Sequence, residues 1–456
     1  MPVNLNRISY NNGSVFSFAV PKCTISQGYL MHGLSSSQES NRSLLGRRQF
    51  LVASGASLAA LMCGTFSVAQ SQQSVKVGFV LPVEGPLADE SRSLLAGFRL
   101  YLEEKKSGPF QVQIIEKNSG PDDGATLPGL AQLLAIEDLR FIVATPSTKG
   151  SEQIIHGLGS ANRVLFVTNP SVRLVSGEMC IPTGFRVCTN TYQTGYPLGP
   201  WAIKNVGQTV FLCGEDSPEM NGSIDFFANG FERSGGTFVD RIMVDEDATD
   251  FTQIIDAVKT SKADAIFAGF SGKKASGFLK AFFKAVPSPK QVILGPDCLS
   301  SYPGTLELIK GTNCSLITAS PLVDPQEFAA RIKRALSIDV PDAARAAEGY
   351  DIARVVLEAA QKVQGEITKH EALVKAVSDV ALEGGPRGKL SFDKNHEPVL
   401  EMSVHKWTVS GQSYARQTLE NLGAVKTPDL GCGRIGFPRK PDAEIKDEDP
   451  VWEEKE

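Results

Sequence analysis

The sequence predicts an α/β protein with two doubly wound parallel-sheet domains, and three observations predict it. Short apolar runs alternate with amphipathic helical segments from Val75 onward. The same alternation restarts after Tyr192 and continues to about residue 320. Repeated strand–helix alternation is typical of a parallel sheet covered by helices on both faces. The length of 456 residues and the 42% hydrophobic content suit two domains of ordinary size.

The first unit shows the pattern clearly. The segment 91–105 carries apolar residues such as Leu94, Leu95 and Phe98 at helical spacing. The other elements follow in the same rhythm. Strands are expected at 75–81, 110–116, 141–145 and 164–168, and helices at 91–105, 123–137 and 151–161.

The second unit repeats this order and ends with a different pattern. Strands are expected at 209–213, 236–244, 265–269, 292–294 and 315–319, with helices at about 223–233, 251–260 and 274–285. Three helical segments without intervening strands follow, at 324–337, 341–364 and 370–381, and then two strands at 388–392 and 400–407. These late elements are expected to complete the two earlier domains, which requires the chain to cross between them more than twice.

The N-terminal segment has the features of an export signal. Arg47 and Arg48 precede a short apolar stretch that ends in small residues near Ala69. The arginine pair followed by Phe and Leu resembles a twin-arginine signal. We therefore expect residues 1–69 to be a leader and the mature chain to be periplasmic, with the true start at either Met1 or Met31. The alternatives are an ordinary helix after an arginine pair, or lipidation at Cys63.

Charge and cysteine usage narrow the class of protein. The leader holds five of the 46 basic residues and one of the 51 acidic residues, so its removal leaves a net charge of −9. No dense basic stripe remains, which argues against a nucleic-acid partner. Six cysteines stay in the mature chain, and exported chains permit disulfides. Cys298 and Cys314 are one expected pair, unless both are simply small buried residues.

The usual signatures of catalysis and metal binding are missing from the sequence. There is no HExxH pair, no GxSxG elbow, no Walker A motif, and no GxGxxG between the first strand and its helix. The loop after that first strand contains Pro82 and Pro86, which lack the backbone donors of a phosphate cradle. We therefore predict no catalytic residue, no metal and no cofactor.

The loops that follow the predicted strands are rich in small hydroxyl and amide groups. Ligands of open parallel sheets bind outside the carboxyl ends of the strands. Such side chains, with helix N-termini, can hydrogen-bond a carboxylate or an amide. Each run taken alone is also an ordinary helix cap. The runs are 147–151, 168–171, 215–217, 271–273 and 295–297.

Over about residues 75–430 the chain resembles the periplasmic solute-binding proteins of branched-chain amino acid and amide ABC importers. The segments that carry the resemblance are short, and their order and spacing make it specific. They are Val77-Gly-Phe-Val-Leu-Pro, Glu84-Gly-Pro, Pro146-Ser-Thr, Val167-Thr-Asn-Pro-Ser171, Gly184-Phe-Arg-Val187, Asp250-Phe-Thr252, Ala263-Asp-Ala265, Gly349-Tyr-Asp351, Gly385-Pro-Arg-Gly388 and Phe392-Asp393.

The resemblance implies a type I periplasmic-binding-protein architecture, in which two lobes joined by a three-strand hinge close on a ligand. It places crossings near 189–193, 319–323 and 382–387. The implied lobes are 74–190 plus 322–383 and 191–321 plus 384–430. The charged, proline-containing composition of the C-terminal segment separately predicts a disordered tail at 433–456. The implied partners are a small-molecule ligand and an ABC permease in the inner membrane, and the chain is expected to be a monomer.

The resemblance also implies the site residues. Ser147 and Thr148 would bind a ligand carboxylate, together with Thr168, Asn169 and Ser171 of the next loop. Asp297 would bind an ammonium group, or would only cap a turn. Asn221 takes the place where many members have an aromatic wall, which makes a branched apolar amino acid less secure as the ligand. A short amide, a urea-like compound or a small organic acid stays open.

Two other functions remain open at this stage. A receptor of the same fold would sense the ligand and report to a regulator instead of a permease. An exported enzyme on an α/β scaffold is the third possibility, and the missing catalytic signatures weigh against it.

Overall fold

The computed structural model describes residues 73–430, apart from positions 145, 178, 302–303, 311, 313, 322–323 and 411–412. The predictions about the leader at 1–69 and the tail at 433–456 lie outside the described residues. Within the described part of the chain, no helix is both long enough and apolar enough to cross a membrane.

The first half of the chain forms a five-stranded parallel sheet in the order β2-β1-β3-β4-β5. Its strands are β1 (Gln73–Leu81), β2 (Phe110–Asn118), β3 (Phe141–Val143), β4 (Val164–Val167) and β5 (Gly184–Arg186). The connecting helices are α1 (Ala88–Glu104), α2 (Thr126–Leu134), α3 (Thr148–Leu158) and the 3-10 turn η1 (Val172–Leu174). The predicted alternation is confirmed here, with boundaries shifted by a few residues.

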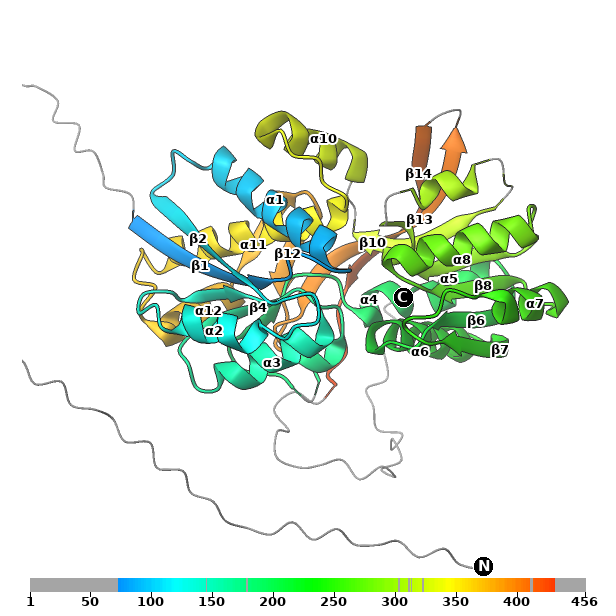
Figure 1. Cartoon of the computed structure of the whole chain (residues 1–456), viewed down its shortest axis with the longest axis horizontal. Helices are drawn as coiled ribbons and strands as arrows, with labels where there is room; N and C mark the ends of the chain where they lie inside the picture. Colours follow the sequence, from blue (N-terminus) through cyan, green and yellow to red (C-terminus); the bar gives the residue numbers. More distant parts are fainter. Residues whose placement is uncertain are drawn as a thin grey trace, which may run out of the picture. The chain divides into compact units, whose positions relative to one another are not determined.

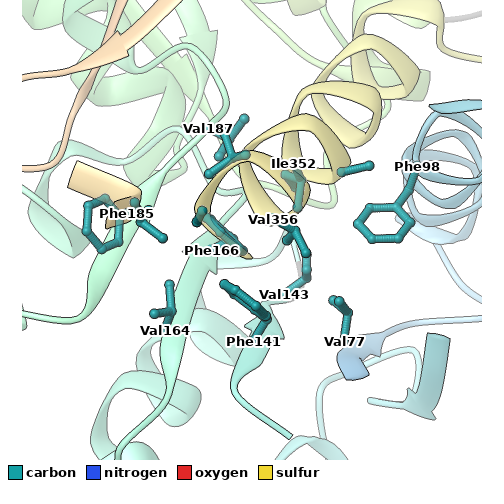
Figure 2. Packing of buried hydrophobic residues seen from close by; sticks show 14 of the residues in the cluster. Val77, Phe98, Phe141, Val143, Val164, Phe166, Phe185, Val187, Ile352 and Val356 are labelled. Atoms are coloured by element: carbon teal, nitrogen blue, oxygen red, sulfur yellow. The ribbon is translucent and has the colours of Figure 1, made fainter. Parts of the chain in front are cut away.

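Both faces of this sheet are buried because successive side chains of a strand point to opposite sides. Val77 and Phe79 face a core that includes α1 and the long helix α11 (Ala343–Lys362), whereas Val80 faces α2 and α3. Figure 2 shows the first of these cores. In it, strand residues meet helix residues: Val77, Phe141, Val143 and Phe166 lie against Phe98 of α1 and Ile352 and Val356 of α11.

The second half forms a nine-stranded sheet in the order β11-β12-β13-β10-β9-β8-β6-β7, with β14 paired to β13. Its parallel strands are β6 (Thr209–Glu215), β7 (Thr237–Val244), β8 (Ala265–Gly269), β9 (Val292–Pro296) and β10 (Leu316–Pro321). Its antiparallel strands are β11 (Ala381–Gly385), β12 (Gly388–Phe392), β13 (Pro398–Ser410) and β14 (Ser413–Val425).

Helices cover both faces of the parallel part of this sheet as well. Helices α5 (Leu198–Asn205) and α6 (Pro218–Arg233) pack on one face, and α7 (Thr252–Thr260) and α8 (Gly272–Ala285) pack on the other. Three short segments complete this half: α4 (Thr191–Gly195), α9 (Cys298–Ser301) and the 3-10 turn η2 (Leu306–Ile309).

Three late helices return to the first sheet. Helices α10 (Pro325–Leu336), α11 and α12 (His370–Ser378) pack with α1 and the first sheet (Figure 1). The chain therefore passes between the two sheets after β5, after β10 and after α12. Leu382 and Leu390 of β11 and β12 pack in the first core although their strands bond to the second sheet. The exact residues that divide the two lobes remain a prediction.

The predicted disulfide between Cys298 and Cys314 is wrong. Both cysteines are free, because each occupies its own environment. Cys298 lies at the start of α9, and its Sγ donates to the carbonyl of Phe270. Cys314 is buried in the core under α8. Among the described cysteines, Cys180 forms a disulfide.

Candidate functional site

A pocket of about 480 Å³, part of it open to solvent, lies where elements of both halves meet. Its walls come from the loop after β4, the segment around α4, the first turns of α6, the β9–α9 turn and the first turn of α11. The carboxyl ends of parallel strands, which supply part of these walls, are where small-molecule sites form in such sheets. The lining residues are Pro170, Thr189, Thr194, Met220, Ser223, Pro296, Asp297, Cys298, Ser301, Asp342, Ala344, Arg345 and Glu348.

The first turn of α11 brings three charged side chains to the pocket. Asp342 caps the helix, and its Oδ1 accepts from the backbone N–H groups of Ala344 at 2.9 Å and Arg345 at 3.0 Å. This cap fixes the backbone at the start of α11, the part of the helix that carries Arg345 and Glu348. Residues three apart on a helix are neighbours, which places Glu348 beside Arg345.

Arg345 is held by two glutamates. Its Nε lies 2.9 Å from Glu90 Oε2, and its Nη1 lies 2.9 Å from Glu348 Oε2. Nη1 also donates to the carbonyl of Thr168 at 2.9 Å. Burial disfavours the guanidinium charge, but Glu348 and Glu90 outweigh this effect and raise the pKa of Arg345. The charge of Arg345 is therefore already balanced by the protein.

Asp297 and Asp342 are the two carboxyl groups of the pocket without a salt bridge in the described part of the chain. Burial raises the pKa of Asp297 to about 6, with Arg416 acting in the opposite direction. Burial also raises the pKa of Asp342 to about 7, and Arg345 opposes that shift. Both groups have lost water without gaining a direct cationic partner. A ligand cation would lower both pKa values.

Of the seven side chains predicted to bind ligand, Asp297 lines this pocket. Ser147 instead caps α3 by accepting from the N–H of Gly150 at 2.9 Å. Thr168 is buried and donates to the carbonyl of Ala144 at 3.0 Å. Their roles toward a ligand remain a prediction.

Ser171 and Asn221 are also engaged with the protein. The carbonyl of Ser171 accepts from Arg186 Nη2, and its N–H donates to Asn169 Oδ1 at 2.8 Å. Asn221, on α6, donates to Asp216 at 2.7 Å and accepts from Arg241 at 3.0 Å. The amide of Asn221 thus bonds to a side chain of the edge strand β7, and Asn221 does not line the pocket.

Thr148 and Asn169 meet Glu219 of α6 in a contact between the two halves. Both donate to the same carboxylate oxygen, Oε1, with Asn169 Nδ2 at 2.8 Å. We call these three residues the interlobe clasp. Burial raises the pKa of Glu219, while the hydrogen bond from Asn169 opposes that shift. Two residues predicted to bind ligand therefore join the lobes through a protein carboxylate.

Replacing Glu219 by alanine is expected to open the ligand-free protein. The change removes the acceptor of Thr148 and one of three acceptors of the Asn169 amide, and a hydrogen bond of this kind contributes about 0.5–1.5 kcal/mol, more when the acceptor is charged. Small-angle scattering without ligand should show a larger radius of gyration than wild type. Glu219→Gln keeps Oε1 and should lie between the two. Glu232→Ala, an exposed position of the same helix, should match wild type; an unchanged radius in Glu219→Ala would contradict the clasp.

The sequence reasoning missed Arg345, Glu348 and Asp342. A signal for them was present, because 343–362 is an alanine-rich helix that is buried along most of its length. Charged residues on such a helix need a partner or a ligand. From the sequence, the segment 341–364 is expected only to be a helix that completes a domain.

Comparison with known proteins places the chain in a family. Residues 74–413 match the model of the periplasmic binding protein family. A Leu/Ile/Val-binding protein homolog 6 from Brucella abortus (strain 2308) is 27% identical over 213 residues, which are 46% of this chain and 54% of that protein. The chain thus spans about half the length of the curated relatives it matches.

Solved structures share the fold. A solute-binding protein of an ABC transporter from R. palustris, in complex with benzoate, has a TM-score of 0.67 and 20% identity, covering 79% of this chain and 99% of that one. A leucine-binding protein from Thermotoga maritima has a TM-score of 0.60 and 20% identity, covering 75% and 99%. A type 1 periplasmic binding protein from Bordetella pertussis has a TM-score of 0.63 and 18% identity, covering 76% and 100%. The chain belongs to the periplasmic binding protein family and has its type I architecture.

Proposed function

We propose that the chain is the extracytoplasmic substrate-binding component of an ABC importer. It binds one small ligand in the pocket between its lobes and then docks on a permease in the inner membrane. Export through the predicted twin-arginine signal at Arg47 and Arg48 and a monomeric state belong to this proposal. The chain performs no covalent step in it, in keeping with a family of binding proteins.

One observation carries the proposal: the pocket takes its walls from both lobes, at the ends of β4 and β9 and at the start of α11. A ligand that touches both lobes stabilises the closed arrangement, because it can shift the equilibrium only by its differential contacts. Closing about a hinge of a few chain crossings is the usual motion of such proteins. The three passages between the sheets supply that hinge.

The ligand is small and polar. The described lining contains no aromatic side chain, and its apolar part consists of two prolines, an alanine and Met220. An amino-acid-like compound, an amide or a small organic acid fits this composition. The R. palustris neighbour is in complex with benzoate, and an aromatic acid therefore belongs in the first screen beside leucine.

A thermal-shift screen of the chain from Gln70 onward tests the proposal. A compound that binds only the folded state stabilises it by RT ln(1 + [L]/Kd), about 2.7 kcal/mol at 100 times Kd. We expect a rise in Tm for a chemically related subset of amino acids, amides, urea and benzoates. Asp297→Ala should abolish the rise, and Asp225→Ala, on the exposed side of α6, should keep it. A panel without any rise would contradict the binding role.

Uptake in cells separates an importer from a sensor. Cells that lack the chain should lose uptake of the identified radiolabelled ligand if the chain serves a permease. If uptake persists and only the transcriptional response to the ligand is lost, the sensing role replaces the importer.

A further inference from the structure

The charges of the pocket do not balance. Its lining contributes three carboxyl groups, Asp297, Asp342 and Glu348, against one guanidinium, Arg345. Behind the lining, Glu90 is bonded to Arg345, Arg416 acts on Asp297, and Glu215, which acts on Cys298, is paired with Lys274, so these charges offset one another. A ligand without charge, or with a negative charge, leaves this excess of acid in place.

Arg345 has little capacity left for a ligand carboxylate. Two of its nitrogens are occupied by Glu90 and Glu348 at 2.9 Å each. In the described part of the chain Nη1 also donates to the carbonyl of Thr168, so only Nη2 has no acceptor, and its two N–H groups point in different directions. A carboxylate prefers two parallel bonds from a guanidinium whose charge is free. One nitrogen cannot supply such a pair, and a neutral oxygen, such as an amide carbonyl, matches the remaining Nη2 group better.

Asp297 is the opposite case. It is recessed in the wall beside Cys298 and has no ion pair in the described residues. Burial of a charge without a partner is unfavourable, and a ligand ammonium supplies the partner. The raised pKa values of Asp297 and Asp342 agree with this shortage of positive charge. Within the described residues no three His, Cys, Asp or Glu side chains could hold a metal ion together.

We propose that the pocket selects a small organic cation, with a protonated amine at Asp297 and a neutral oxygen acceptor at Arg345. This inference rests on the proposed binding function and names its ligand class. The expected ligand of this chain thus differs in charge from the benzoate bound by the R. palustris protein. A benzoate would place its only charge among three carboxyl groups.

Four compounds of one carbon skeleton test the charge rule by calorimetry. They are leucine amide (amine and neutral carbonyl), leucine (amine and carboxylate), 4-methylpentanamide (neutral carbonyl alone) and 4-methylpentanoate (carboxylate alone). We expect leucine amide to bind most tightly and 4-methylpentanoate most weakly. Tightest binding of leucine or of 4-methylpentanoate would overturn the charge rule and leave the binding function standing.

A substitution locates the amine. Asp297→Asn should raise the Kd of leucine amide at least about tenfold, since a hydrogen bond to a charged group is lost. Asp225→Asn changes the same chemistry on the exposed side of α6 and should leave Kd unchanged. An unchanged Kd in Asp297→Asn, with the fold verified by circular dichroism, would overturn the assignment. If none of the four compounds binds, the charge rule is overturned, and the wider Tm screen decides separately whether the chain binds a solute.

Discussion

Gly349→Ala is expected to destabilise the protein severely. A Cβ at this position of α11 would lie 1.8 Å from the backbone carbonyl oxygen of Leu94 in α1. The obstacle is main chain, so no side-chain rotation relieves it, and the two helices must move apart. Overpacking a core costs about 1–3 kcal/mol and sometimes more, and we expect the upper end because both helices are buried here.

The sign of the change in unfolding free energy distinguishes packing from helix propensity. Alanine favours a helix over glycine by about 1 kcal/mol, so a net loss of stability reports the packing alone. Gly97→Ala should behave in the same way, because its Cβ would lie 1.6 Å from the carbonyl oxygen of Ala346. Gly277→Ala in α8 is the matched control. Its nearest neighbour is a Phe251 ring atom at 3.3 Å, and we expect a change near zero.

Urea unfolding followed by circular dichroism measures this prediction. The midpoint should fall clearly for the substitutions at Gly349 and Gly97 and stay near wild type for Gly277. Ligand affinity should fall with Gly349→Ala as well, because Arg345 and Glu348 lie within one helical turn of this position. A variant with wild-type stability would mean that α1 and α11 are not in contact as described.

The fold could be predicted from the sequence to a large extent, because its parallel strands are buried on both faces. The strand expected at 75–81 is β1 (Gln73–Leu81), and the helix expected at 91–105 is α1 (Ala88–Glu104). Such strands are apolar throughout and contrast sharply with the helices around them. Gly349 belonged to the segments that carry the family resemblance, and its contact with Leu94 gives the physical reason for a glycine there.

The elements that the sequence reasoning did not find lack this signal. β5 has three residues, which is too short to show an alternating pattern of apolar and polar residues. β14 (Ser413–Val425) pairs only with β13, and its described side chains are mostly exposed. A strand whose side chains are mostly exposed shows little alternation of apolar and polar residues. α4 has only five residues, and α5 has Pro197 at its N-cap and Pro200 in its first turn, so neither shows a long helical period.

The candidate site was harder to predict for a different reason. The strand-end loops were found, but their hydroxyl and amide groups can bond the protein as well as a ligand. Asn169 shows this most clearly, because its amide bonds Pro146, Thr148 and Glu219. Arg345 lies 48 residues after Asp297 in the sequence, and the two residues line one pocket only because the chain folds back between the lobes.

The crossing after β5 is fixed by a buried ion pair. Arg186 and Glu397 have fully buried side chains, with Nε 2.9 Å from Oε2. Asn190, at the start of α4, donates to the same oxygen at 2.8 Å and to Thr427 at 2.6 Å. One carboxylate therefore joins the end of β5, the beginning of α4 and the turn before β13. Three elements that border this crossing thus meet at Glu397.

Glu397→Ala is expected to cost about 3–5 kcal/mol of unfolding free energy, because it leaves the guanidinium of Arg186 buried without its partner. Urea unfolding should show a much lower midpoint than wild type. Glu420→Ala removes a partner of the exposed pair with Lys204, at 3.5 Å, and such pairs contribute about 0–1 kcal/mol. Equal losses in the two variants would contradict a structural role for the buried pair.

A double variant separates the missing charge from the missing contact. Arg186→Met with Glu397→Leu replaces both ions by apolar groups of similar length, and exchanges of this kind are often neutral or stabilising. We expect it to recover most of the stability lost in Glu397→Ala. Ligand affinity should recover less, since the amide of Asn190 no longer has the carboxylate that ties α4 to β13. If affinity recovers fully, the pair stabilises the fold without positioning the hinge; if it stays low while stability returns, Glu397 sets the geometry in which the lobes close on their ligand.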